Sequence, residues 1–225
     1  EVPESALYGV QTLRGIENFR ISKFHLNEYP LFIQALAITK MGAAVANREL
    51  DLLTEEQADA ILKACKEILE GKHHDQFPVD MIQGGAGTTT NMNANEVIAN
   101  RALELMGHQR GEYQYCSPND HVNRSQSTND AYPTAIHIGL YYTHLKLVKH
   151  FEVLIESFRK KATEFAHVIK MGRTQLQDAV PMTLGQTFNG LATILRQSIW
   201  VLRLLEPESP PNRNMPKSVL PLCVR

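Results

Sequence analysis

The chain has 225 residues, 43% of them hydrophobic and 21% charged, which is enough to bury a substantial core in one or two domains. Its formal net charge of -1 provides no large field for a polyanion. We therefore expect neither nucleic acid nor a membrane surface as a partner. The three cysteines show no CxxC or Cys/His ligand spacing, so neither a disulfide framework nor a zinc site is indicated.

No apolar run approaches the about 20 residues that span a bilayer, and the first residues do not form a secretory signal. These features predict a cytoplasmic protein with small-molecule or protein partners. The first residue is not Met, which suggests a fragment or a trimmed chain.

Helical patterns occupy most of the chain. A helix is predicted over residues 30–50, because Pro30 suits a first helical position and apolar residues follow at three- and four-residue steps. A capping box at Thr54 opens a second helix that stops at Gly71. A third helix is predicted over residues 92–106.

The next two predicted helices are long and have continuous apolar faces. One runs over residues 132–169, roughly 50 Å at about 1.5 Å per residue. The other follows a second capping box at Thr183 and continues to about residue 205, with leucines that repeat by sevens as in a helical bundle. A pair of such helices cannot cover both apolar faces, so we expect oligomerisation. At Pro207 the pattern breaks, and the Pro-rich stretch 207–225 is expected to be a disordered tail.

Three polar stretches carry the candidate chemistry: 87–93, 127–130 and 172–178. We interpret each as hydroxyl and amide side chains placed at a helix start, where unpaired N–H groups can hold a small carboxylate. Plainer interpretations stay open for each stretch taken alone. They are a Gly-rich loop with a threonine cap, an N-cap with a turn, and a solvated connector.

The ordered set of motifs resembles the fumarase/aspartase superfamily over about residues 1–205. The segments that carry the resemblance are YGVQTLRGIENF at 8–19, DQFPVD at 75–80, GGAGTTTNMNANEVIANRALELMG at 84–107, NDHVNRSQSTNDAYPT at 119–134 and KMGRTQLQDAVPMTLGQ at 170–186. The resemblance implies a mainly α, L-aspartase/fumarase-like long-helix bundle, truncated here. It also implies a homotetramer in which each active site draws on three subunits.

The resemblance also divides the chain and assigns its site. It implies an N-terminal helical domain at 1–126, a partial central long-helix domain at 127–206 and a tail at 207–225 that is unlike the family. The substrate-binding residues that it implies are Thr88, Ser127, Thr128, Asn129, Thr174 and Gln175.

The implied reaction is the reversible elimination of ammonia from L-aspartate to give fumarate, with no organic cofactor and no metal ligands assigned. Fumarases and some other members of the superfamily carry a histidine where this chain has Gln175, and class II fumarases usually carry one where it has Ser117. Both differences favour L-aspartate as the substrate, the second more weakly. A class II fumarate hydratase and a non-catalytic assembly fragment are the alternatives.

The family's third active-site stretch, a GSSxMPxKxNP loop whose serine is the catalytic base, is not found in the sequence. Met215-Pro216-Lys217 is similar to its middle, but no Ser-Ser pair precedes it. No catalytic residue is therefore assigned, and we expect the chain to be inactive alone.

Overall fold

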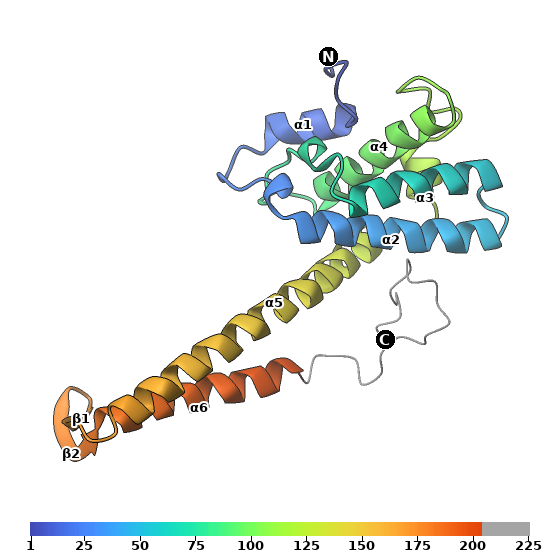
Figure 1. Cartoon of the computed structure of the whole chain (residues 1–225). Helices are drawn as coiled ribbons and strands as arrows, with labels where there is room; N and C mark the ends of the chain where they lie inside the picture. Colours follow the sequence, from blue (N-terminus) through green and yellow to red (C-terminus); the bar gives the residue numbers. More distant parts are fainter. Residues whose placement is uncertain (204–225) are drawn as a thin grey trace. The chain divides into compact units, whose positions relative to one another are not determined.

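The computed structural model describes residues 1–203, and the Pro-rich stretch 207–225 lies outside them (Figure 1). Helices dominate the described part, so the mainly α prediction is confirmed. The chain divides into two compact units, Glu1–Leu140 and the part that begins at Tyr141. This division does not test the predicted domains 1–126 and 127–206, which stay a prediction.

The first unit packs its helices around one hydrophobic core. Helix α2 (Pro30–Glu49) contacts α3 (Glu55–Leu69), α3 contacts α4 (Thr88–Leu105), and α1 (Val10–Asn18) contacts α4. Ile33, Leu36, Ile61, Ile98 and Leu103 are among the fully buried side chains of this core. The elements are α1 (Val10–Asn18), η1 (Leu26–Glu28), α2 (Pro30–Glu49), α3 (Glu55–Leu69), η2 (His74–Gln76), α4 (Thr88–Leu105), the π-helical turn η3 (Pro118–Val122) and the first turns of α5.

The predicted boundaries of α2 and α3 agree closely with the structure. Pro30 occupies the first position of α2. The capping box before α3 is present, because the Thr54 hydroxyl accepts from the Gln57 amide and the Gln57 side chain accepts from the Thr54 amide, both at 3.2 Å. At the other end of α3, Gly71 lies two residues after Leu69 and has a φ of +89°, as the predicted stop requires.

Helix α4 begins at Thr88, four residues before the predicted start at Met92. The prediction was wrong there because the buried face of this helix is largely polar at its first turns. Asn91, Asn93 and Glu96 are almost fully buried, so the apolar period that marks most helices is missing at its first turns.

Glu96 ties α4 to the start of α1. Its carboxylate accepts from the backbone amides of Gly9, Gln11 and Thr12 at 2.9, 2.9 and 3.0 Å, and from the Thr12 hydroxyl at 2.7 Å. Glu96 is 2% exposed. A buried carboxylate therefore satisfies the unpaired N–H groups at the beginning of α1 and adds a favourable charge there.

The two cysteines of the described residues are buried and free. Both Cys65 and Cys116 lie in the first unit. Burial raises the pKa of each thiol to about 12, and nearby Lys40 lowers the pKa of Cys65 only in part. The neutral thiol is therefore the form present in the folded protein.

Helix α5 (Thr128–Glu164) ends before residue 169, where the sequence predicted its end. A β-hairpin follows, with β1 (Ile169–Thr174) antiparallel to β2 (Gln177–Thr183). Gly172 permits close pairing, because a Cβ atom there would lie 2.9 Å from the Met182 sulfur. Only the predicted end at residue 169 was wrong, because the residues from Ile169 onward pair across two strands instead of extending the helix.

Helix α6 (Leu184–Arg203) begins with the predicted capping box, in which Thr183 and Gln186 exchange hydrogen bonds of 2.9 and 3.1 Å. It packs with α5 around a small core of Val148, Ile155, Ala192 and Ile199. Leu205, the last residue of the predicted heptad series, lies outside the described residues.

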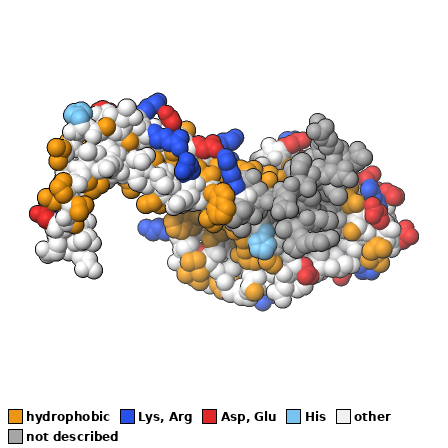
Figure 2. Space-filling model, turned by 90° about the horizontal axis from the view of Figure 1, so that it is seen from below, with side chains coloured by type: hydrophobic (Ala, Val, Ile, Leu, Met, Phe, Trp, Pro, Cys, Tyr) orange, Lys and Arg blue, Asp and Glu red, His pale blue; other side chains and the backbone are white. Residues whose placement is uncertain are grey.

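Several large apolar side chains of α5 and α6 remain exposed. Figure 2 shows hydrophobic side chains open to view between basic and acidic ones on one face of the molecule. Among residues 1–203 no helix is both long and apolar enough to cross a membrane. The exposed set in these two helices includes Leu140, Leu147, Val153, Leu154, Leu191, Ile194, Trp200 and Val201.

Candidate functional site

Two of the three predicted polar stretches come together inside the first unit. The start of α4 carries Thr88, and the start of α5 carries Ser127, Thr128 and Asn129. The two starts are joined directly, because the Asn91 side-chain amide donates to the Thr128 hydroxyl at 3.3 Å. The structure therefore brings these segments, about forty residues apart in sequence, to one place.

The cap of α4 comes from outside the helix. Gly87 precedes it with a φ of +88° and has no side chain to offer. Gln83 acts as the cap, since its carbonyl oxygen accepts from the Thr90 amide at 2.8 Å and its amide donates to the Thr90 hydroxyl at 2.8 Å. The Thr88 hydroxyl donates to the Gly85 carbonyl at 2.6 Å, so it must rotate before it can donate to a ligand.

At the start of α5, one residue is used as a cap and two are not. The Ser127 hydroxyl accepts from the Asn129 amide at 3.1 Å, and the Ser127 amide donates to the Asp130 carboxylate at 2.8 Å. Ser127 thus has the plainer role of an N-cap, although its hydroxyl proton stays available. Capping does not occupy the side chains of Thr128 and Asn129, which fits the prediction of a ligand at this point.

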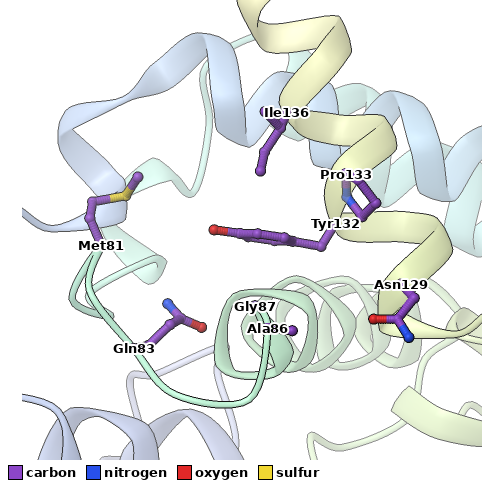
Figure 3. A pocket seen from close by; sticks show the side chains of 8 residues that line it. All are labelled: Met81, Gln83, Ala86, Gly87, Asn129, Tyr132, Pro133 and Ile136. Atoms are coloured by element: carbon purple, nitrogen blue, oxygen red, sulfur yellow. The ribbon is translucent and has the colours of Figure 1, made fainter.

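A pocket of about 440 Å³ opens beside these helix starts (Figure 3). The Tyr132 ring extends into it from α5, and Met81 and Gln83 approach from the loop before α4. Burial raises the pKa of Tyr132, so the phenol is neutral at ordinary pH. The lining residues are Met81, Gln83, Ala86, Gly87, Asn129, Tyr132, Pro133 and Ile136.

The third predicted stretch, 172–178, is not at a helix start. Thr174 and Gln177 form the last pair of the hairpin, and Gln175 and Leu176 make its turn with φ values of 50° and 67°. The interpretation of this stretch as a helix-start anion site was wrong, because the chain reverses there as two strands. The assignment of Thr174 and Gln175 to a substrate site stays a prediction.

A buried lysine that was not predicted from the sequence lies behind the start of α5. Lys40 of α2 is fully buried, and its ammonium donates to the side-chain oxygens of Asn123 at 2.8 Å and Gln126 at 3.1 Å. Burial lowers the pKa of Lys40 to about 7, and the neighbouring Cys65 opposes this shift. A signal was present in the sequence, because Lys40 lies seven residues after Ile33 on the same helix face.

The lowered pKa of Lys40 leads us to expect that the stability of the fold depends on pH. Its pKa is about 7 in the folded chain and returns to 10.5 on unfolding, so the unfolded chain binds more protons between these values. The free energy of unfolding should therefore rise by about 3 kcal/mol from pH 7 to pH 9.5. Urea unfolding at several pH values measures this slope. The Lys40→Met variant should lack the rise, and equal slopes in the two proteins would contradict the assignment.

Known proteins are similar to this chain over most of its length. A family model described as lyase matches residues 1–209. Aspartate ammonia-lyase of Pseudomonas canavaninivorans is 58% identical over 208 residues, which are 92% of this chain and 44% of that protein. The enzyme of the same name from Helicobacter pylori strain J99 is 59% identical over 199 residues, which are 88% of this chain and 42% of that protein.

Solved structures of lyases and fumarases are also similar to this chain. A Brucella melitensis structure titled fumarate lyase:delta crystallin has a TM-score of 0.83 and 51% identity, and covers 91% of this chain and 47% of that chain. A class II fumarase from Schistosoma mansoni has a TM-score of 0.76 and 38% identity, over 91% of this chain and 44% of that chain. The chain spans less than half the length of the relatives it matches. By these matches the chain belongs to the lyase family of the fumarase/aspartase superfamily.

Proposed function

We propose that the chain carries part of the substrate site of an enzyme that reversibly eliminates ammonia from L-aspartate to give fumarate. The observation that carries this proposal is the meeting of the α4 and α5 starts at the bond between Asn91 and Thr128. The relatives named aspartate ammonia-lyase, at 58% and 59% identity, support the choice of substrate. The proposed substrate contacts are Thr88, Ser127, Thr128, Asn129, Thr174 and Gln175.

The chemistry accounts for neutral donors at such a site. Removal of a proton from the carbon beside the β-carboxylate of L-aspartate places its electron pair on that carboxylate and yields a dianion. The protonated amino group then leaves as ammonia and takes the carbon–nitrogen electron pair with it. The electron pair held on the dianion returns to form the carbon–carbon double bond of fumarate. Hydroxyls such as those of Ser127 and Thr128 stabilise the dianion more than the substrate, because the charge on the carboxylate grows during the reaction.

Turnover requires a base that the assigned residues do not supply. The resemblance places this base on a serine loop that is not among the 225 residues, and we propose that these residues act as part of a tetramer that supplies it. A cytoplasmic location and the domains 1–126 and 127–206 belong to the same proposal. The exposed apolar faces of α5 and α6 are consistent with such assembly.

A complementation assay tests this function. A complete aspartate ammonia-lyase with its Ser-Thr-Asn stretch inactivated is refolded alone and together with the purified chain. Ammonia release from L-aspartate should appear only in the mixture, and the chain alone should give none. Turnover of L-malate instead would favour the fumarate hydratase alternative. Co-purification without turnover of either substrate would indicate a non-catalytic assembly partner.

Thr128 should contribute strongly to the complemented activity. In the mixed assembly Thr128→Val removes one preorganised donor and should lower kcat by about a hundredfold. Thr163→Val is the matched control in the same helix, since the Thr163 hydroxyl donates within that helix to the Arg159 carbonyl at 3.2 Å. Steady-state kinetics with L-aspartate measure both variants. Equal kcat values for the two would remove Thr128 from the site.

A further inference from the structure

A chain of hydrogen bonds leads from Lys40 to the proposed site. Lys40 donates to the Asn123 side-chain oxygen at 2.8 Å, and the Asn91 amide donates to the same oxygen at 3.1 Å. The Asn91 amide also donates to the Thr128 hydroxyl at 3.3 Å. Four side chains from α2, α4, the loop before α5 and α5 itself thus form one connected network.

Lys40 begins this network, and its ammonium helps to determine which groups donate and which accept in the bonds that follow. Below its pKa the Lys40 ammonium has donors only, and the Asn123 side-chain amide group donates to the Gln126 carbonyl at 2.9 Å, so the Asn123 side chain turns its oxygen toward Lys40. Asn91 must then present its amide group to that oxygen. The same amide group donates to the Thr128 hydroxyl, whose oxygen is therefore an acceptor and whose proton stays free.

This arrangement leaves one group unsatisfied. The Asn91 side-chain oxygen is buried and has no hydrogen-bond partner within the described residues. If Asn123 were free to turn over, Asn91 could turn as well and offer this oxygen to Thr128. The Thr128 proton would then bond to Asn91 instead of pointing to a ligand. Lys40 and the Gln126 carbonyl together keep the network in the orientation that leaves the Asn91 oxygen unsatisfied.

We propose that Lys40 is a positioning residue, which orients Asn123 and Asn91 so that the Thr128 hydroxyl proton remains available to a substrate carboxylate. The effect of Lys40 on substrate binding and turnover rests on the proposed function. The effect of Lys40 on the orientation of the two amides does not. A buried lysine without a carboxylate partner is expensive, and a methionine of similar length would fill the same space at lower cost.

Side-chain amide exchange tests the orientation directly. In Lys40→Met the side-chain amides of Asn91 and Asn123, followed by 15N NMR, should exchange with solvent about tenfold faster or more. The amides of Asn93 and Asn100 serve as internal controls. They donate to the carbonyls of Gln76 at 3.0 Å and Leu7 at 2.7 Å, outside the network, and should be unchanged.

A matched variant separates this effect from a general loosening of α2. Thr39→Val alters the adjacent buried residue, whose hydroxyl donates within α2 to the Ala35 carbonyl at 2.9 Å, and should leave all four amides unchanged. If Lys40→Met does not fold, Lys40→Gln provides the same comparison with a shorter neutral side chain. Unchanged exchange at Asn91 and Asn123 in the folded Lys40 variant would overturn the inference.

The complementation assay supplies the functional arm. Lys40→Met should lower kcat of the mixed assembly about tenfold while KM changes little, because the free Thr128 proton matters most when carboxylate charge grows. Thr39→Val should match the wild type. An unchanged kcat in Lys40→Met would also overturn the inference. A wild-type chain that fails to complement contradicts the proposed function, and the amide exchange then decides the role of Lys40 by itself.

Discussion

Replacement of Glu96 with alanine is expected to destabilise the first unit by about 4 kcal/mol. The substitution leaves the amides of Gly9, Gln11 and Thr12 and the Thr12 hydroxyl without their shared acceptor. Three of these four groups become buried unsatisfied donors, because the bonds to Gly9 and to both groups of Thr12 are buried. Urea unfolding followed by circular dichroism measures the loss.

Two controls narrow the interpretation of the Glu96 result. Glu17→Ala removes an exposed carboxylate from α1, the helix that Glu96 caps, and should change the stability by less than about 0.5 kcal/mol. Glu96→Gln keeps the shape but turns one acceptor into a donor that faces other donors, so it should also be strongly destabilising. A loss below about 1 kcal/mol in Glu96→Ala would show that water replaces the carboxylate at the start of α1.

The second large effect is expected at Gly87, where backbone and packing both require glycine. Its φ is +88°, and a Cβ atom at this position would overlap the ring of Tyr132. Gly87→Ala should therefore cost about 1 kcal/mol for the left-handed backbone and about 2 kcal/mol more for displacement of the ring. The ring lines the pocket, so complemented activity should fall as well.

Gly107 provides the matched control for this substitution. Its φ is +83°, but a Cβ atom there would meet nothing within 4 Å. Gly107→Ala should thus show the backbone cost alone, and the difference between the two urea midpoints isolates the contact with Tyr132. The double variant Gly87→Ala/Tyr132→Ala should recover part of that difference. Equal losses at Gly87 and Gly107 would contradict the packing argument.

The fold was predictable from sequence wherever an element carries its own local signal. The helix at residues 30–50, the capping boxes at Thr54 and Thr183 and the stop at Gly71 depend on neighbouring residues only, and each is present in the structure. The early start of α4 was missed because its buried asparagines gain their partners from distant segments. The hairpin was missed for a similar reason, since its strands are satisfied only by each other.

The candidate site shows the same division. Hydroxyl and amide residues clustered at helix starts predicted Thr88 and residues 127–129 as candidates, because a cap needs one such residue and several were present. The cap supplied by Gln83 and the ammonium of Lys40 were not predicted. Their roles depend on contacts across seven residues in one case and more than eighty in the other. Spacing along the chain does not encode contacts of that kind.

The reactivity of the two buried cysteines measures how often the first unit opens. A thiol that stays protonated and enclosed reacts with an alkylating reagent only after the structure around it separates. In a Cys223→Ser background, labelling of Cys65 and Cys116 counted by mass spectrometry follows the opening of residues 1–140 in the native buffer. The same labelling rate, measured with complete subunits present, would show how far assembly slows the opening of this unit.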